Sequence, residues 1–209
     1  MTYPILIIVV AYILGGIPFG LIIGLLARGT DIREHGSGNI GASNAWRVLG
    51  RGWGSFIFAL DVIKGYAPVM VSHHFSGIGS PLPIFAGLAS IIGHNFSPFL
   101  KFRGGKGAAT SLGVTIGLSP IAAAISFGVW LVVVGLTRYI SVASVCAVAA
   151  GAFFVWWLNS KIAVYGAFGL IAFVFTLVKH RSNFKRLRAG TENKVKFGKD
   201  PQKPEDAAN

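Results

Sequence analysis

Residues 93–110 read Gly-His-Asn-Phe-Ser-Pro-Phe-Leu-Lys-Phe-Arg-Gly-Gly-Lys-Gly-Ala-Ala-Thr and lie between two apolar segments. Three positions lack a side chain and can bring backbone N–H groups close to an anion: Gly104, Gly105 and Gly107. Lys106 adds a positive charge, and a helix beginning near Ala108 would point its free N–H groups at the same anion. The stretch therefore predicts a phosphate-binding loop. Because the nucleotide-binding P-loop pattern is absent, an ordinary basic turn remains the alternative.

The composition predicts an all-α integral membrane protein. Of 209 residues, 53% are hydrophobic and 12% are charged, whereas a soluble domain carries roughly 25% charge. Several apolar runs approach or exceed the roughly 20 residues that span a bilayer core. They lie at about 4–26, 53–72, 82–100, 112–136, 141–158 and 162–178. The first run lacks a basic leader and a cleavage site, so we interpret it as a retained span.

Basic residues concentrate in three gaps, which the positive-inside rule places on the cytoplasmic face. They are Arg28, Arg33, Arg47 and Arg51, then Lys101, Arg103 and Lys106, then the segment from Lys179 onward. The connection 72–83 has no charged residue and Arg138 is alone in its turn, so both are expected on the outer face. This distribution also explains the net charge of +12 without any binding of nucleic acid.

The positions of the basic gaps require an odd number of crossings, with the N-terminus outside and the C-terminus cytoplasmic. The run 112–137 contains Gly117 and Pro120 and can be broken there, and 44–50 can form a short half-helix. We expect one transmembrane domain at 1–194 and a disordered polar tail at 195–209. Close helix packing is expected at Gly15, Gly16, Gly20, Gly24, Gly113, Gly117, Gly128 and Gly135.

The first basic gap contains a Gly-x-Gly-x-x-Gly pattern formed by Gly36, Gly38 and Gly41. A dinucleotide site would need a preceding strand and a βαβ unit, which a helical membrane chain does not provide. Instead, backbone amides and the side chains of Ser37 and Asn39 can converge on a phosphate or glycerol ligand. Arg47 follows within reach of a bound anion. A polar cytoplasmic turn is the alternative.

The third basic segment, 179–192, reads Lys-His-Arg-Ser-Asn-Phe-Lys-Arg-Leu-Arg-Ala-Gly-Thr-Glu. Its cations suit topology determinants or contacts with anionic lipid. His180 and Asn183 are three residues apart, hence on one helix face, where they can hydrogen-bond a polyol. Glu192 is expected to pair with a neighbouring arginine.

Two charged residues stand inside the second apolar run. Asp61 and Lys64 are three residues apart, so we expect a structural ion pair near the site rather than a direct catalytic role. His94 either shapes the loop that follows it or contacts the ligand. The single cysteine, Cys146, excludes an intramolecular disulfide and any cysteine-based metal site.

Three motifs, in this order, resemble the bacterial acyl-phosphate-dependent glycerol-3-phosphate acyltransferases, the PlsY family. They read Gly-Ser-Gly-Asn-Ile-Gly-Ala-Ser-Asn at 36–44, Gly-His followed by Phe-Arg-Gly-Gly-Lys-Gly-Ala-Ala-Thr within 93–110, and His-Arg-Ser-Asn followed by Gly-Thr-Glu within 180–192. The resemblance covers roughly residues 4–194. Ser43 stands where the family often has threonine, which suits a position that needs only a hydroxyl.

The resemblance implies transfer of a fatty acyl group from acyl phosphate to the 1-hydroxyl of glycerol 3-phosphate, giving lysophosphatidic acid and phosphate, the first step of phospholipid synthesis. It also implies a multi-pass protein of about seven transmembrane helices in the bacterial inner (plasma) membrane, surrounded by membrane lipid, whose active site faces the cytoplasm. Seven satisfies the odd number of crossings that the basic gaps require. No cofactor, metal or obligatory protein partner is expected. The His-x-x-x-x-Asp pair of acyl-CoA enzymes is excluded, because no histidine here has an aspartate five residues later.

We expect the reaction to depend on positioning and charge stabilisation, because acyl phosphate is already activated. The predicted catalytic residues are Ser37, Lys106, His180 and Asn183. The predicted substrate-binding residues are Gly36, Gly38, Asn39, Gly41, Asn44, Arg47, His94, Arg103, Gly104, Gly105, Gly107, Thr110 and Arg181. The proton of the attacking hydroxyl can pass to His180 or to an oxygen of the acyl phosphate. A transporter of organic phosphates and a non-catalytic lipid-binding protein are the competing functions.

Overall fold

The computed structural model describes residues 3–76, 80–159 and 163–195, and all regular secondary structure in these ranges is helical. The helices are α1 (Tyr3–Gly16), α2 (Phe19–Arg28), α3 (Ala42–Leu49), α4 (Arg51–Ser76), α5 (Leu82–Asn95), the 3-10 helix η1 (Pro98–Leu100), α6 (Ala108–Leu118), α7 (Pro120–Thr137), α8 (Ile140–Leu158), α9 (Ala163–Lys179) and α10 (Arg181–Arg188). In lipid a helix satisfies its own backbone polar groups, which explains this choice for apolar runs. The predicted all-α architecture is confirmed.

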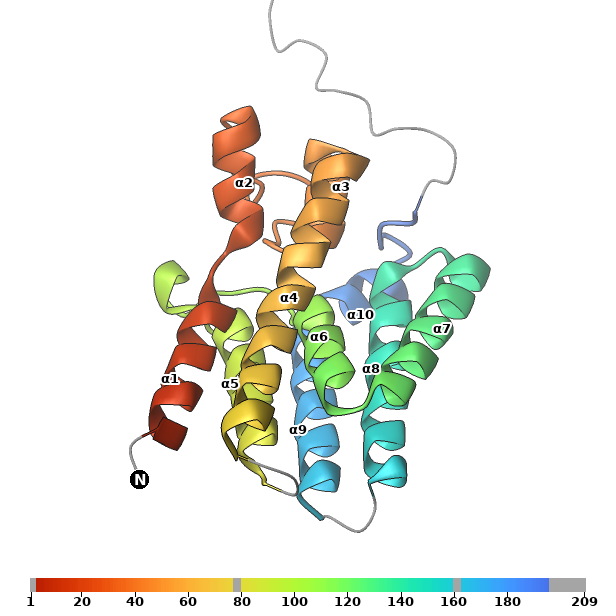
Figure 1. Cartoon of the computed structure of the whole chain (residues 1–209). Coiled ribbons are helices and arrows are strands. Elements are labelled where there is room, and N and C mark those ends of the chain that lie inside the picture. The colour runs from red at the N-terminus through yellow and green to blue at the C-terminus, as the bar shows by residue number, and fades with distance from the viewer. Residues whose placement is uncertain (1–2, 77–79, 160–162, 196–209) are drawn as a thin grey trace, which may run out of the picture.

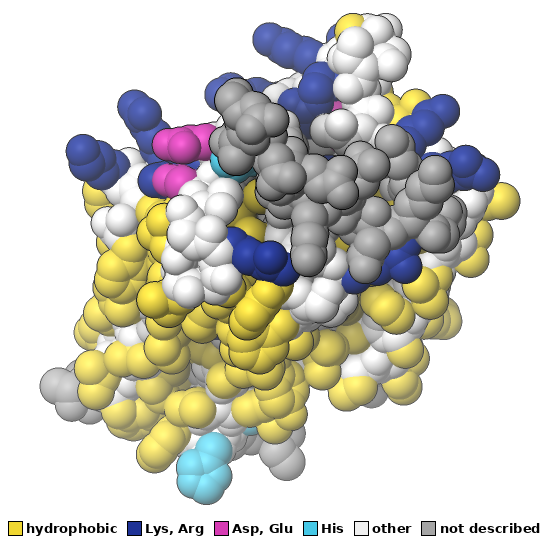
Figure 2. Space-filling model, turned by 90° about the horizontal axis from the view of Figure 1, so that it is seen from above, with side chains coloured by type: hydrophobic (Ala, Val, Ile, Leu, Met, Phe, Trp, Pro, Cys, Tyr) yellow, Lys and Arg dark blue, Asp and Glu magenta, His cyan; other side chains and the backbone are white. Residues whose placement is uncertain are grey.

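The apolar helices form one bundle and run alternately up and down in Figure 1. One end of the bundle, called the basic end below, carries α3, the loop 96–107, α10 and residues 189–195. Seen from this end, the surface carries many Lys and Arg side chains among apolar ones (Figure 2). The three basic gaps therefore share one face, as the positive-inside rule requires.

Helix length limits which elements can cross a membrane. Among the described residues, α4, α7 and α8 are each long and apolar enough, and counting each bent pair as one span gives five. The bent pairs are α1 with α2, at 40°, and α9 with α10, at 50°. Helix α6 has 11 residues, about 16 Å at the helical rise, roughly half of the hydrocarbon core. The arrangement is compatible with about seven crossings, a number that stays a prediction.

The break predicted in the run 112–137 is present between α6 and α7. The Ser119 hydroxyl accepts a hydrogen bond from the amide of Ala122 at 3.4 Å, and Pro120 occupies the first turn of α7, where its missing N–H costs nothing. The chain reverses here, so α7 returns to the basic end. The half-helix predicted at 44–50 is also present, as α3.

The turn at Arg138 does not lie on the outer face as predicted. The Arg138 carbonyl accepts a hydrogen bond from the amide of Val195 at 2.8 Å, which places the α7–α8 turn at the basic end. The reversal at Ser119 is the reason, because it adds one crossing before this turn. The predicted tail 195–209 lies outside the described residues apart from Val195.

Glycines allow backbone contact between two helix pairs. A Cβ on Gly15 would clash with the Ser90 carbonyl oxygen on α5, and one on Gly113 would clash with the Val62 carbonyl oxygen on α4. The predicted packing role is confirmed there and also at Gly16 and Gly117. An added Cβ on Gly20 or Gly24 would instead clash with the carbonyl oxygen of Ile40 or Thr30, in the connection between α2 and α3. The predicted packing role is wrong for Gly128 and Gly135, where an added Cβ would have no described neighbour within 4 Å.

The predicted ion pair is present inside the bundle. The Lys64 Nζ lies 2.7 Å from the Asp61 Oδ1, and their side chains are 4% and 3% exposed. The same Nζ donates a hydrogen bond to the Ile17 carbonyl at 2.8 Å. Ile17 stands at the bend between α1 and α2, where Pro18 interrupts the helical bonding. The pair therefore attaches α4 to this bend, as a structural role requires.

Candidate active site

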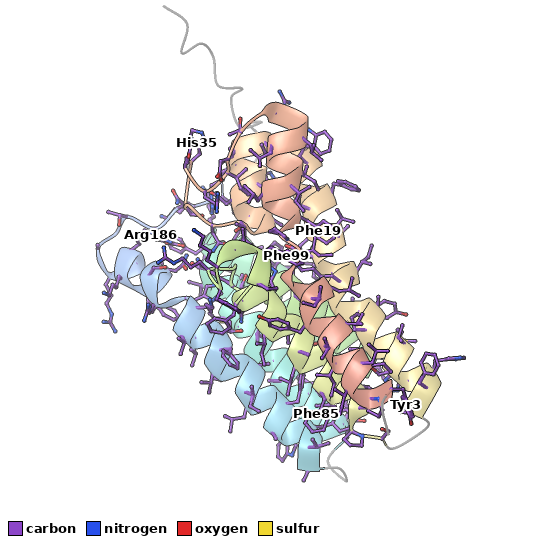
Figure 3. The ribbon with its side chains drawn as sticks, turned by 90° about the vertical axis from the view of Figure 1, so that its left-hand side faces the viewer. Tyr3, Phe19, His35, Phe85, Phe99 and Arg186 are labelled. Carbon is purple, nitrogen blue, oxygen red and sulfur yellow. The ribbon has the colours of Figure 1, made fainter. Side chains whose placement is uncertain are left out.

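A cavity of about 380 Å³ lies between α3, α4, α6, α7, α8, α9 and α10. Its wall at the basic end carries residues from all three sequence motifs: Ser37, Asn39, Gly41, Ser43, Arg47, Lys106, Gly107, His180, Asn183 and Glu192. Figure 3 shows α10, which bears Arg186, beneath the loop that bears His35, at the end of the bundle opposite Tyr3 and Phe85. The fold therefore brings together segments that are far apart in the sequence.

The N-terminus of α6 forms one part of this polar wall. The helix begins at Ala108, as predicted, and Gly107 precedes it in a left-handed conformation with φ of 78°. Gly107, Ala108 and Ala109 line the cavity. The N–H groups of a first helical turn have no intrahelical acceptors, so this end offers donors and a positive dipole to an anion.

Gly104 and Gly105 serve the loop differently from the prediction. Their N–H groups donate hydrogen bonds to the carbonyls of Asn95, at 3.3 Å, and His94, at 2.9 Å. These amides are thus engaged within the protein, and the expectation that they face an anion is wrong. A Cβ on Gly105 would clash with the His94 ring. His94, which is 4% exposed and lines the cavity, therefore shapes the glycine loop.

The N-terminus of α3 forms a second part of the polar wall. Asn44 is fully buried, and its Oδ1 accepts a hydrogen bond from the Ser37 amide at 2.7 Å. Its Nδ2 donates to the carbonyls of Ile32, at 2.7 Å, and His35, at 3.1 Å. Asn44 consequently holds the loop in place and does not line the cavity.

Arg47 projects from α3 into the same wall. Burial lowers the pKa of its guanidinium, and the nearby Arg186 acts in the same direction, while Glu192 opposes them. A guanidinium is not deprotonated in proteins, so Arg47 stays charged at neutral pH. The polar wall thus holds a permanent cation, which comes from the last turn of α3.

Lys106 faces Arg47 across the site and is bound to the third motif. Its Nζ donates a hydrogen bond to the Oδ1 of Asn183. Burial lowers the Lys106 pKa to about 8, and the positive charges of Arg186 and Arg47 add to the shift, partly offset by Glu192. The ammonium is therefore mostly protonated at pH 7, yet close enough to its pKa to lose the charge in mild alkali.

Glu192 connects three segments at the edge of the cavity. Its Oε1 accepts hydrogen bonds from Asn183 Nδ2 at 2.6 Å and from Ser141 Oγ at 2.8 Å. Its Oε2 accepts one from Arg186 Nε at 2.8 Å, which confirms the predicted pairing with an arginine. Burial alone would raise the Glu192 pKa, but these hydrogen bonds outweigh it and leave the pKa below its usual value.

Sequence reasoning did not find Ser141 and Arg186. Ser141 belongs to an otherwise apolar run, and Arg186 is one of several cations in its segment. Glu192 is the isolated acidic residue in the basic segment 179–192, and it was a signal that hydrogen-bond donors lie nearby, because a buried carboxylate needs several of them. The identity of those donors depends on the approach of α8 to α10.

His180 lines the cavity, and one of its ring nitrogens is hydrogen-bonded within the protein. The Nδ1 lies 2.8 Å from the Thr176 carbonyl oxygen. Because that oxygen can only accept, Nδ1 carries the proton and Nε2 is left as an acceptor. Burial lowers the His180 pKa to about 4, opposed by the Thr176 hydrogen bond and assisted by the charge of Lys106. His180 is therefore neutral at physiological pH.

The cavity lining does not include every residue predicted for the site. Exposed positions away from it are Gly36, Gly38, Arg103 and Arg181. Buried or partly buried positions away from it are Asn44, Gly104, Gly105 and Thr110. Thr110 packs against α4, where a Cβ on Gly65 would clash with its carbonyl oxygen. Direct substrate contact by these eight residues is not supported by the geometry.

Beyond the polar wall the cavity becomes apolar. Its inner part is lined by Leu112, Phe127, Trp130, Val148, Phe168 and Ala172. The sequence analysis named none of these residues, because apolar side chains inside a membrane bundle look alike in sequence. One cavity thus joins a polar, cationic end to an apolar end.

Comparisons with known proteins agree with this geometry. The sequence matches the family described as glycerol-3-phosphate acyltransferase over residues 5–190. A glycerol-3-phosphate acyltransferase of Geobacter sulfurreducens is 44% identical over 198 residues, covering 94% of this chain and 100% of the relative. One of Desulforudis audaxviator is 42% identical, covering 93% and 97%.

Two crystal structures of PlsY, described as an integral membrane glycerol 3-phosphate acyltransferase, share the fold. The glycerol 3-phosphate form has a TM-score of 0.88 at 37% identity and covers 93% of this chain and 96% of that chain. The lysophosphatidic acid form has a TM-score of 0.86 at 36% identity, with the same coverage. With the family match, the sequence identities and the shared fold, the chain is a membrane protein of the glycerol-3-phosphate acyltransferase family.

Proposed function

We propose that this chain transfers a fatty acyl group from acyl phosphate to the 1-hydroxyl of glycerol 3-phosphate inside the cavity. One observation carries the proposal. A single cavity has two helix N-termini, Arg47 and Lys106 in its polar wall, and it continues into an apolar compartment. Both substrates bear a phosphate, and one bears a hydrocarbon chain. A site that takes them together needs both environments at once.

The phosphates bind between the N-termini of α3 and α6, where Ser37, Arg47 and Lys106 converge. Charge-assisted hydrogen bonds to phosphate are stronger than neutral ones. Asn183 is bonded on one side to Lys106 and on the other to Glu192, so it holds the lysine in position and its free N–H is available to a glycerol oxygen.

The chemical step needs no covalent enzyme intermediate. The 1-hydroxyl oxygen of glycerol 3-phosphate attacks the acyl carbonyl carbon, the bond from that carbon to the phosphate oxygen breaks, and phosphate leaves with its negative charge held by Lys106 and Arg47. With a pKa of about 4, His180 is a weak base, whereas a phosphate oxygen has a second pKa near 6. The proton therefore passes to the departing phosphate, and His180 Nε2 orients the hydroxyl by accepting its hydrogen bond.

The donor is tested by phosphate release from purified protein in detergent, given palmitoyl phosphate with and without glycerol 3-phosphate. Palmitoyl-CoA serves as the rival donor. Release that depends on glycerol 3-phosphate and yields lysophosphatidic acid supports the proposal. Transfer from palmitoyl-CoA alone would refute the donor, and no transfer by folded protein would favour a transporter of organic phosphates.

The proposal places the protein in the bacterial inner membrane with the basic end in the cytoplasm, in agreement with the gathering of cations there (Figure 2). Single cysteines in a Cys146→Ala background test the orientation. Lys185 is exposed at the basic end and His74 is exposed in the last turn of α4, towards the other end. In intact spheroplasts a membrane-impermeant maleimide should label His74→Cys and spare Lys185→Cys. The reverse labelling would overturn the orientation.

A further inference from the structure

The apolar compartment of the cavity ends at a level where four helices come into close contact. A Cβ on Gly169 of α9 would lie 2.8 Å from the Ala152 carbonyl oxygen of α8, so these two backbones nearly touch. At the same depth, a Cβ on Gly151 of α8 would lie 3.1 Å from Ser126 Oγ of α7 and 3.7 Å from Thr115 Cγ2 of α6. Contacts this short leave no room for a chain to pass.

The side chain that closes this level is Phe168, which is 2% exposed and lines the cavity. Behind it lies the buried cluster that includes Val155 and Val114. The two hydroxyls at this depth already donate hydrogen bonds to carbonyls, Ser126 to Ala147 at 2.6 Å and Thr115 to Ser111 at 2.8 Å. Both of these hydroxyls are therefore engaged within the protein, so this level of the cavity suits a terminal methyl group.

Small side chains leave space above this level. Ala147 and Ala172 each line the cavity about one helical turn nearer the polar wall than Ala152 and Phe168. On α8 the distance along the axis from Ser141, at the polar wall, to Ala152 is about 16 Å. A compartment with this depth and a defined end limits how many methylenes of an acyl chain can enter.

We infer that Phe168 and Ala172 set the length of the acyl chain that the enzyme prefers, with Phe168 as the end stop and Ala172 as the space above it. The inference rests on the proposed function, since it requires the acyl chain to lie in this cavity. Every methylene that enters contributes about 0.8 kcal/mol, or roughly fourfold in kcat/KM. A methylene that cannot enter contributes nothing or forces the chain out of position.

The test is a competition among lauroyl, myristoyl, palmitoyl and stearoyl phosphate in one reaction, with the lysophosphatidic acid products separated by mass. Product ratios report relative kcat/KM and do not depend on the amount of active enzyme, so a loss of stability alone leaves them unchanged. Ala172→Leu should lower the palmitoyl to lauroyl ratio at least about tenfold, equivalent to roughly two excluded methylenes. Phe168→Ala should shift preference in the opposite direction, towards stearoyl.

Leu170→Ala is the matched control, because Leu170 lies on the same helix but is 65% exposed on the outer surface. Its ratios should equal those of the unmodified protein. Unchanged ratios in both Ala172→Leu and Phe168→Ala, or the same shift in Leu170→Ala, would overturn the assignment of chain length to these residues. If the unmodified protein converts none of the four acyl phosphates, the proposed donor fails instead, so the two failures are distinguishable.

Discussion

At the polar end of the cavity, loops and helix ends are connected by hydrogen bonds between side chains, whereas at the apolar end helices touch through residues with small side chains. Lys106, Asn183, Glu192 and Ser141 form one continuous chain of bonds. Around Gly151 and the other glycines, the contacts are between backbones or backbone and side chain. The comparison teaches that chemistry and shape are specified separately in this bundle.

The reason lies in the surroundings of each end. Buried charges need several partners, because each unsatisfied donor or acceptor is costly. Between apolar helices in a membrane, close van der Waals packing replaces the hydrophobic effect, and only small residues permit it. A change at one end should therefore alter catalysis or stability in a way that the other end does not reproduce.

The largest expected effect is at Lys106. Lys106→Ala removes the cation that faces the phosphate and should lower kcat/KM by about 10² to 10³, to near background, while the protein still folds. Lys101→Ala is the matched control, since Lys101 lies in the same loop but is exposed. Steady-state kinetics with thermal unfolding of each variant provide the measurement. An active Lys106→Ala enzyme would remove Lys106 from the mechanism.

The next largest effect is expected at Glu192, whose hydrogen bonds hold the residues of the polar end in place. Glu192→Gln replaces one acceptor oxygen with an N–H₂ group, so the donors Ser141, Asn183 and Arg186 cannot all be satisfied. We expect kcat/KM to fall by about tenfold to a hundredfold, mainly through kcat, because Asn183 and Lys106 lose their position. Glu34→Gln, at an exposed position, is the control. Equal activity of both variants would show that Glu192 does not position the site.

A substitution away from the polar end should change stability rather than chemistry. Gly113→Ala pushes a methyl group against the Val62 carbonyl of α4 and should lower the free energy of unfolding by about 1–3 kcal/mol. Gly128→Ala, with no described neighbour within 4 Å, should be neutral or slightly stabilising. The measurement is the unfolding midpoint in detergent. Equal unfolding midpoints for the two variants would show that the close contact at Gly113 does not contribute to stability.

The smallest effect is produced by pH. In the proposed mechanism a protonated Lys106 holds the phosphate, and its pKa is about 8, so kcat/KM for glycerol 3-phosphate should decline above about pH 8 and approach a tenfold loss per unit. Lys106→Arg, if active, should lose this alkaline decline, because a guanidinium stays charged. A profile that stays flat to about pH 9.5 would contradict the role of the lysine charge.

Several features of the site are local in the sequence and were predictable. The start of α6 at Ala108 follows from the glycines before it, and the Asp61–Lys64 pair follows from the three-residue spacing on a helix. The break before α7 follows from Pro120. Each depends on interactions within about one helical turn, which is why residue order was sufficient.

Other features required the packed bundle. Among the cations of the loop 96–107, only the fold shows that Lys106 lines the cavity while Arg103 is exposed. The sequence analysis also did not predict that the Gly105 amide donates a hydrogen bond to the His94 carbonyl, or that the turn at Arg138 lies at the basic end. These outcomes depend on which surfaces meet across long stretches of chain.

The amino-acid sequence by itself determined that the chain is helical, lies in a membrane, gathers its cations at one end and carries three motifs of one acyltransferase family, because composition, spacing and charge act over a few residues at a time. Only the tertiary structure decided which donors reach Glu192, which predicted residues leave the cavity, and where the apolar compartment ends. The physical reason is that helix packing sets the distances between distant segments, and hydrogen bonds and close contacts form only where those distances allow.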